Sequence, residues 1–241
     1  NNIYIGVLDI YRSTNGGTSF SQWNSWSNPS GSTYTHADIH MIREFNGDMY
    51  FGTDGGVYKL PSGSAQTTDL TEGLAIGQFY RISVSPQTSD NIVGGLQDNG
   101  GYAYSNSSWK NFYGADGMDT AIDPNDSNNY YGFIQNGGSL YISNDAGASL
   151  SGSVSAPDSE SGNWITPLVM NKEGELYAGY NSLYRLESGQ FEAVSFYLGD
   201  RIDGIAIDPI DSNVIFLYIN QDLFKSEDRG STFNIVETFS R

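Results

Sequence analysis

The sequence lacks cysteine, and it has only 11 lysine and arginine residues against 28 aspartate and glutamate residues. Without cysteine the chain forms no disulfide bond and carries no thiol chemistry. The net charge of −17 argues against nucleic acids and anionic membrane surfaces as partners, because both are bound through basic side chains. No run of about 18 apolar residues is present, so we expect no membrane insertion. The acidic balance instead favours cations or neutral molecules.

Glycine and aromatic residues are abundant, with 29 glycines and 14% Phe, Trp and Tyr. In the segment 114–150, short apolar runs at 120–122, 130–134 and 140–142 are separated by turns rich in Gly, Pro, Asn and Asp. Such runs predict strands joined by tight turns, and no helical period is present. The pattern indicates an all-β protein.

A glycine hairpin recurs along the chain, as Ser13–Phe20, Ser143–Leu150 and Ser226–Phe233. Its glycines at 17, 147 and 230 lie three and two periods of about 42 residues apart, and such a period is typical of propeller blades. We therefore predict one β-propeller domain over residues 1–241, with about six four-stranded blades at approximately 1–35, 36–77, 78–115, 116–163, 164–200 and 201–241. The first blade lacks its innermost strand in this interpretation, which predicts a fragment of a larger propeller or multidomain chain.

Within the hairpins, Asp145 and Asp228 are expected to accept hydrogen bonds from the backbone and from hydroxyl groups of the same hairpin. The apolar residues that end the hairpins, Phe20, Leu150 and Phe233, would then cover the apolar layer of each blade. The Ser- and Gly-rich stretch 150–163 is interpreted as a surface excursion between the fourth and fifth blades.

These hairpins resemble Asp-box (bacterial neuraminidase, BNR) repeats. Nearly the whole chain is similar to BNR-repeat propellers of the sortilin-like and xyloglucanase-like superfamily, especially large secreted bacterial ones, through the phrases at 36–40, 52–59 and 95–100. The resemblance implies an extracellular or cell-surface location. It does not fix the function, because members of the superfamily include hydrolases, receptors and assembly factors.

In a propeller, the loops that lead into the innermost strands share one face with the turns between second and third strands. This face is the predicted binding surface, at one mouth of the central channel. Its predicted ligand-binding residues are His36, Asp38, His40, Asp54, Tyr80, Arg81, Gln97, Asn99, Asp119, Gln135, Trp164, Tyr180 and Arg201.

His36, Asp38 and His40 are a candidate metal site. Alternate residues of a strand share a face, so the only two histidines of the chain would point the same way as the aspartate between them. Zinc is the metal that this set suits, with calcium as the alternative; no other cofactor is expected. The other interpretation is that the histidines bond to backbone groups and fix the loop.

Asp98 and Asp116 are the candidate catalytic residues, with Asp54 behind them, because glycoside hydrolysis requires two carboxyl groups across a cleft. The xyloglucanase resemblance implies one aspartate from each of two tandem propellers, so this chain would supply one half. Turn formation explains Asp54 and Asp98 equally well. The favoured function is a non-catalytic module that binds a glycan or an extracellular protein, and the alternative is a glycoside hydrolase of the xyloglucanase-like type.

Overall fold

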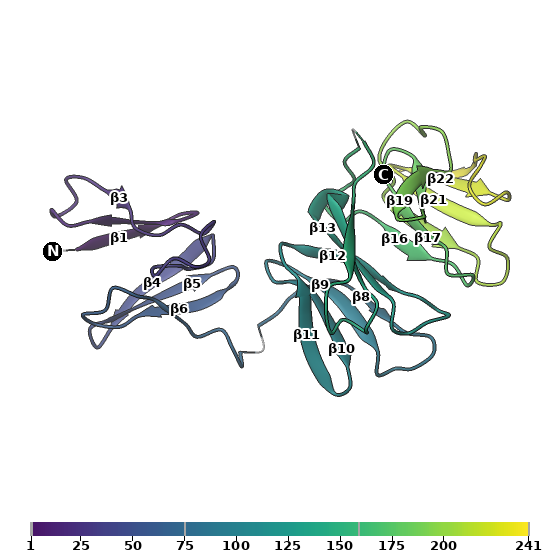
Figure 1. The fold of residues 1–241 in the computed structure, drawn as a ribbon. Helices are drawn as coiled ribbons and strands as arrows, with labels where there is room; N and C mark the ends of the chain where they lie inside the picture. The colour runs from purple at the N-terminus through teal and green to yellow at the C-terminus, as the bar shows by residue number, and fades with distance from the viewer. Residues whose placement is uncertain (1, 75, 159, 241) are drawn as a thin grey trace. The chain divides into compact units, whose positions relative to one another are not determined.

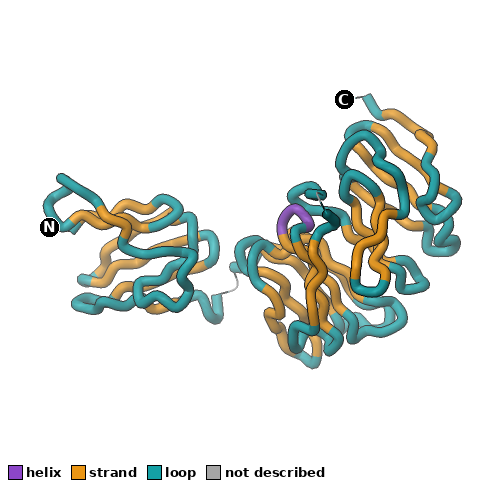
Figure 2. Tube along the Cα trace, turned by 45° about the horizontal axis from the view of Figure 1, so that its top comes forward, coloured by secondary structure: helices purple, strands orange, loops and turns teal. Residues whose placement is uncertain are grey.

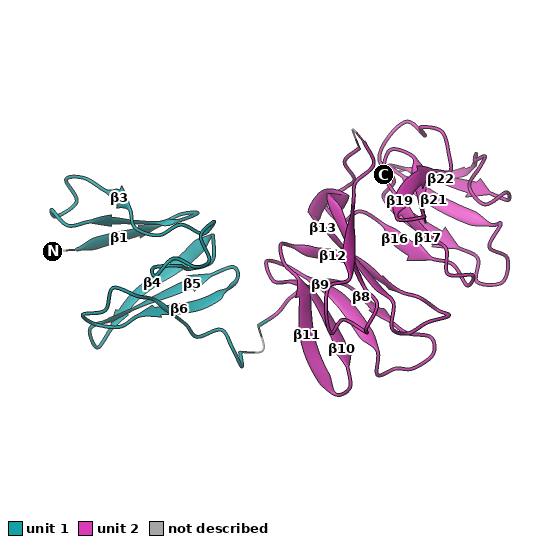
Figure 3. Ribbon diagram, viewed as in Figure 1, with its two compact units in different colours: residues 1–76 teal, residues 77–241 magenta. Residues whose placement is uncertain are grey.

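The computed structural model describes residues 2–74, 76–158 and 160–240. Contacts within the chain divide it into two compact units, residues 1–76 and residues 77–241 (Figure 3). Each unit is described separately below, and the single domain over 1–241 stays a prediction.

Unit 1 contains two antiparallel sheets, which lie face to face in Figure 1. The first sheet consists of β1 (Ile3–Gly6), β2 (Ile10–Ser13) and β3 (Ser21–Gln22). The second consists of β4 (Ile39–Phe45), β5 (Asp48–Thr53), β6 (Gly56–Leu60) and β7 (Thr68–Asp69).

Unit 2 contains four sheets of four strands, each in simple up-and-down order. The first consists of β8 (Phe79–Val84), β9 (Ile92–Leu96), β10 (Gly100–Ser105) and β11 (Ser108–Tyr113), and the second of β12 (Gly117–Ile122), β13 (Tyr130–Ile134), β14 (Ser139–Ser143) and β15 (Gly152–Ser155). The third consists of β16 (Leu168–Met170), β17 (Leu176–Gly179), β18 (Leu183–Glu187) and β19 (Gln190–Ala193), and the fourth of β20 (Gly204–Ile207), β21 (Ile215–Ile219), β22 (Asp222–Ser226) and β23 (Asn234–Thr238).

Successive four-stranded antiparallel sheets are the blades of a β-propeller, so the predicted fold class is confirmed. The first blade has three strands, as predicted. Its glycine hairpin follows β2, whereas the hairpins of the fourth and sixth blades follow the third strands β14 and β22. The strands β1 and β2 therefore correspond to the second and third strands of a complete blade. In the part of the chain that the structure describes, the only helical element is the 3₁₀ turn η1 (Gln135–Gly137), and no helix there could cross a membrane.

The apolar cores lie between neighbouring blades, because each sheet has an apolar face that only the next sheet can cover. Between the fourth and fifth blades, Phe133 and Leu140 pair across two strands and pack with Leu176 and Tyr180. Separate clusters join the third blade to the fourth, the fifth to the sixth and the first to the second.

The glycine hairpins have the predicted hydrogen bonds. The carboxylate of Asp145 accepts bonds from the hydroxyl groups of Ser149 and Ser143, at 2.7 and 2.8 Å, and from the backbone N–H of Ser149 at 2.8 Å. Asp228 accepts the equivalent three bonds from Thr232 and Ser226. The hairpins thus close on themselves and also pack on the preceding blade, since Ser105 donates to the carbonyl of Ala146 at 3.0 Å.

Two expectations about these segments are wrong. Phe20 and Leu150 are exposed, and of the three residues that end the hairpins only Phe233 packs against a core cluster. The stretch 150–163 is not only a surface excursion, because Gly152–Ser155 pairs with β14 as the outer strand β15. Val154 is the one strand-favouring side chain of β15 and packs against the core between the fourth and fifth blades, so the stretch carries little of the usual strand signal.

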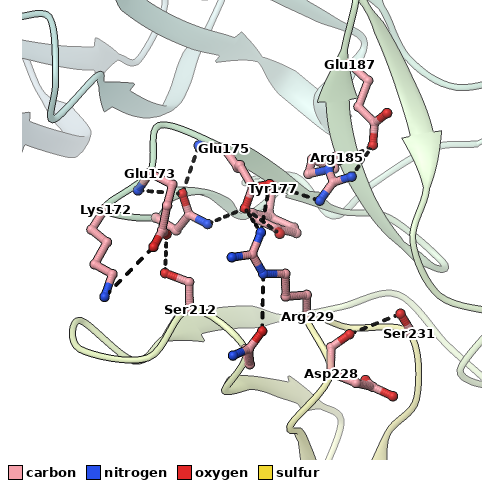
Figure 4. Close-up of polar contacts among 12 residues, drawn as sticks. Lys172, Glu173, Glu175, Tyr177, Arg185, Glu187, Ser212, Asp228, Arg229 and Ser231 are labelled. Atoms are coloured by element: carbon pink, nitrogen blue, oxygen red, sulfur yellow. Dashed lines mark hydrogen bonds and ion pairs between the residues drawn. The ribbon is translucent and has the colours of Figure 1, made fainter.

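A polar network joins the fifth and sixth blades at the end of the strands where the hairpins lie (Figure 4). Glu175, in the turn between β16 and β17, accepts bonds from Arg185 at 3.1 Å and from Arg229 of the third hairpin at 3.3 Å. Asn171 and Tyr177 donate to the same carboxylate, at 2.6 and 3.3 Å. One carboxylate thus connects both blades.

The hairpin aspartates make stability depend on pH. Hydrogen bonds from the Ser149 and Thr232 side chains, with further bonds from their hairpins, lower the pKa of Asp145 and of Asp228 to about 2 from 3.8. A lowered folded-state pKa adds stability above the unfolded value, and that stability is lost as pH falls from about 4 through about 2. We expect the double variant D145N/D228N to lose less stability over this range than the unmodified chain, measured by urea unfolding at each pH.

The first hairpin shows why asparagine is tolerated there. Asn15 occupies the aspartate position, accepts from Ser13 and from the backbone of Ser19 at 2.8 and 3.0 Å, and donates to the Ser19 hydroxyl at 2.9 Å. The control is D90N, which removes a surface charge outside the hairpins. An equal loss of stability in D145N/D228N and the unmodified chain would contradict the expectation.

Candidate functional site

The candidate site is one rim of unit 2. It consists of the loops that lead into β8, β12, β16 and β20 and of the turns between the second and third strands of each blade. The antiparallel order of each sheet places all these segments at the same end of the strands. The glycine hairpins, which follow the third strands, lie at the other end.

Asp98 and Asp116, the predicted catalytic pair, meet on the rim although they come from different blades. Asp98 lies in the turn between β9 and β10 with a left-handed φ of 59°, and its backbone N–H donates to a carboxylate oxygen of Asp116 at 2.9 Å. Both residues are half-buried. Asp116 therefore fixes the Asp98 turn, and the two side chains begin from neighbouring positions.

The predicted residues Gln97 and Asn99 flank Asp98 and complete this turn. The backbone N–H of Gln97 donates to the carbonyl of Gln78 at 3.0 Å, and the Asn99 amide donates to the carbonyl of Gln97 at 3.0 Å. Asn111 donates in turn to the carbonyl of Asn99 at 2.9 Å. The turn is thus tied to its own sheet on both sides.

Asp119 lies in a bulge of β12, where the pairing with β13 shifts between Gly117 and Thr120. Its carboxylate accepts the backbone N–H groups of Leu168 at 3.1 Å and Thr120 at 3.0 Å. Burial raises the pKa of Asp119, whereas these two bonds and the charge of Arg81 act in the opposite direction. Because both oxygens hold backbone groups, Asp119 links the innermost strands of the fourth and fifth blades.

Tyr80 and Arg81 lie at a bulge of β8. Arg81 is exposed and donates to the carbonyl of Tyr80 at 2.9 Å, and the Tyr80 side chain packs against the core between the fourth and fifth blades. The arginine is thus the more exposed of the two side chains.

The turn η1 carries Gln135 and joins the loop before β16 (Figure 2). The backbone N–H of Asn136 donates to the carbonyl of Trp164 at 3.1 Å, and that of Gly162 donates to the carbonyl of Asn136 at 3.0 Å. These two bonds fix the backbone around Trp164, whose side chain is 48% exposed. The amide oxygen of Gln135 is buried and has no hydrogen-bond partner among the described residues.

Tyr180 was predicted to contact ligand, but it is fully buried. Its hydroxyl donates to the carbonyl of Gly137 at 2.7 Å, and its ring packs against Phe133 and Tyr184. Burial raises the pKa of Tyr180. The residue supports the rim from below and does not face solvent, which corrects the prediction.

Between the fifth and sixth blades, the rim is held by Asp203. Its carboxylate accepts the amide of Asn163 at 2.9 Å and the backbone N–H of Asn220 at 2.7 Å. Asp200 accepts a hydrogen bond from the Asn220 amide at 3.0 Å, and this bond is the main cause that lowers the pKa of Asp200. The predicted residue Arg201 lies beside these groups, exposed to solvent.

The remaining predicted residues belong to unit 1, and the strand arrangement expected for the metal site does not occur there. Asp38 has a left-handed φ of 59° and β4 begins only at Ile39, so His36, Asp38 and His40 do not alternate along one strand. The His36 ring lies against Gly55, and its Nδ1 is 3.3 Å from the Ala37 carbonyl oxygen.

His40 sits in a bulge of β4 and pairs with Asp54. Among the described residues, no group of three His, Cys, Asp or Glu side chains could hold a metal ion. The structure therefore favours the other interpretation, in which these residues fix their loops.

Sequence reasoning missed two exposed aromatic side chains of the rim. Phe196 and Tyr197, in the loop between β19 and β20, are 87% and 65% exposed. It also missed Glu160, which accepts the backbone N–H of Asn181 and the hydroxyl of Tyr184, each at 3.2 Å. The adjacent aromatic pair in a loop was the available signal.

The fold is similar to that of solved propellers. A GH74 enzyme of Niastella koreensis matches 97% of this chain and 43% of its own at 16% identity and a TM-score of 0.52. The GH74 xyloglucanase of Xanthomonas campestris matches 98% of this chain and 43% of its own at 16% identity and a TM-score of 0.50. A functionally unknown protein of Desulfotomaculum acetoxidans matches 100% of this chain and 80% of its own at 12% identity and a TM-score of 0.52.

At these identities the likeness shows the β-propeller fold alone. The chain spans less than half the length of the two GH74 enzymes. No family model matches the sequence, and a search of curated proteins found no match.

Proposed function

We propose that the protein is an extracellular binding module whose rim on unit 2 binds a glycan. The observation that carries the proposal is the exposure of Trp164 on a backbone fixed by hydrogen bonds. An aromatic ring that is held in place and open to solvent can stack on the apolar face of a sugar at little entropic cost.

The surrounding chemistry supports a sugar as the ligand. Phe196 and Tyr197 add further exposed rings, and amide and carboxylate groups at Asn163, Asp200 and Asn220 can exchange hydrogen bonds with hydroxyl groups. Few basic groups lie on this rim, so the proposal favours a neutral glycan over an anionic one.

The test is affinity electrophoresis in gels that contain soluble xyloglucan or hydroxyethyl cellulose. We expect the unmodified chain to be retarded by one of these polysaccharides and W164A to bind at least about tenfold more weakly, because loss of a stacking tryptophan removes much of the contact. The matched control is W26A, since Trp26 is 46% exposed in unit 1 and lies outside the rim. Equal retardation of W164A and the unmodified chain would contradict the proposal. If the rim binds a protein and not a glycan, neither polysaccharide should retard the chain, and a ligand should be found only in a screen of proteins.

Glycoside hydrolysis is the second candidate, because Asp98 and Asp116 come together from two blades. In this alternative the two carboxyl groups would act as the acid and the base or nucleophile of the reaction. Release of reducing ends from xyloglucan would support it if D98N and D116N both abolished the release. If no reducing ends are released even at high protein concentration, hydrolysis is contradicted and glycan binding remains the proposed function.

A further inference from the structure

A pocket of about 840 Å³ lies between the two sheets of unit 1, far along the strands from the loops that contain His36 and Asp54. Small-molecule sites have volumes of about 300–1,000 Å³, so this pocket is large enough for one. Its lining comes from β1, β2, β4, β5, the end of β6 with the 61–65 turn, and the loop after β3. All of these elements belong to unit 1.

One wall of the pocket is apolar and aromatic, whereas the rest of the lining is mainly polar. Tyr4 and Trp23 pack edge to face with ring centroids 5.7 Å apart, and Ile42, Met49 and Leu60 complete the surface. These side chains are buried or half-buried, so an apolar ring placed among them would lose much of its contact with water. The wall thus suits a flat apolar body.

One cation faces this wall. The guanidinium of Arg12 lies over the Tyr4 ring, 5.7 Å from its centroid, and its Nε is buried without a hydrogen-bond partner in the described part of the chain. Arg12 forms no ion pair there, although Arg185 and Arg229 both contact Glu175. A buried donor without a partner costs free energy that a bound acceptor would recover.

The acidic residue that lines the pocket forms no ion pair with Arg12 in the described part of the chain. Glu44 is exposed, and its carboxylate accepts the backbone N–H of Gly47 at 2.6 Å. In a chain with 28 acidic residues, a half-buried arginine that has no acidic partner is therefore the unusual feature of this pocket.

We propose that this pocket binds a small amphipathic anion, in which a carboxylate, sulfonate or phosphate group is joined to an apolar ring. The anionic group accepts N–H bonds from Arg12, whose fork of donors matches such groups. The ring lies against Trp23 and Met49. This site is separate from the rim and does not depend on the function proposed for it.

The probe is 8-anilinonaphthalene-1-sulfonate, which carries a sulfonate on an apolar ring system and is fluorescent when shielded from water. Its uncharged relative N-phenyl-1-naphthylamine lacks the sulfonate. We expect saturable binding of the sulfonate at one site per chain. R12Q should weaken that binding about tenfold, because a charge-assisted bond is lost, and should leave binding of the naphthylamine unchanged.

Two further variants locate the site. M49W fills the pocket and should abolish binding of both probes, whereas E44Q removes a carboxylate from the mouth and should strengthen binding of the sulfonate only. Thermal unfolding by circular dichroism checks that each variant is folded. If R12Q does not fold, the affinity of E44Q for the sulfonate still decides the test. The proposal is overturned if R12Q and E44Q leave the affinity for the sulfonate unchanged, or if M49W still binds it.

Discussion

Replacement of Gly95 by alanine is expected to destabilise the protein by more than about 3 kcal/mol, at the upper end of the range for overpacked sites. Gly95 lies in β9, where its backbone meets β12 of the next blade. A Cβ atom there would come within 2.0 Å of the Met118 carbonyl oxygen and within 2.3 Å of the Gly117 carbonyl carbon. Both contacts are with backbone, which cannot turn aside as a side chain can.

The matched control is G152A. Gly152 also lies in a strand, but no atom is within 4 Å of the place where its Cβ would be, so we expect a change within about 0.5 kcal/mol. Urea unfolding of both variants, followed by tryptophan fluorescence, measures the difference. A loss below about 1 kcal/mol in G95A would mean that β9 and β12 do not approach each other this closely in solution.

The repeating pattern of turns and short apolar runs explains why the fold could be predicted from the sequence. Turn residues recur with a fixed period, and each short apolar run between turns can form only a strand. The three-stranded first blade followed from the same count, because the Ser13–Phe20 hairpin comes after two strands rather than three. The period of the turns was thus enough to predict the propeller architecture, and side-chain positions were not needed.

The second large effect is expected at Glu175. Removal of this carboxylate in E175A leaves Arg185 and Arg229 without their shared partner and deprives Asn171 and Tyr177 of an acceptor. Breaking a partly buried network costs more than breaking a surface pair. Because the Glu175 side chain is still 25% exposed, we expect a loss of about 2 kcal/mol in the free energy of unfolding.

The control is E227A. Glu227 pairs with Lys225 in the same blade, but its side chain is 73% exposed, so we expect a loss within about 0.5 kcal/mol. E175Q should fall between the two, because it keeps the packing and one acceptor oxygen. Urea unfolding at low and at 0.5 M salt measures all three. Equal costs for E175A and E227A would show that the network in Figure 4 does not hold the blades together.

The candidate site was less predictable than the fold, and particular residues show why. Loop position placed Asp98 near Asp116 and Trp164 on the rim, because the ends of antiparallel strands gather in space. It could not show that Tyr180 points into the core, since a turn residue can face either way. It also could not show the left-handed Asp38 or the bulge at His40, because one extra residue in a strand reverses which side chains share a face.

The outer strands of the blades decide how copies of this chain could associate through their sheet edges. In unit 1 the outer strands β3 and β7 are only two residues long, too short to serve as templates for another strand. β23 is longer, and Ile235 and Val236 on it are exposed. A bulge opposite Leu223 and Phe224 interrupts its pairing, and such a bulge discourages the addition of a further strand. At these three strands, edge-to-edge self-association, a route to aggregation for β proteins, is therefore opposed by the short length of β3 and β7 and by the irregular pairing of β23.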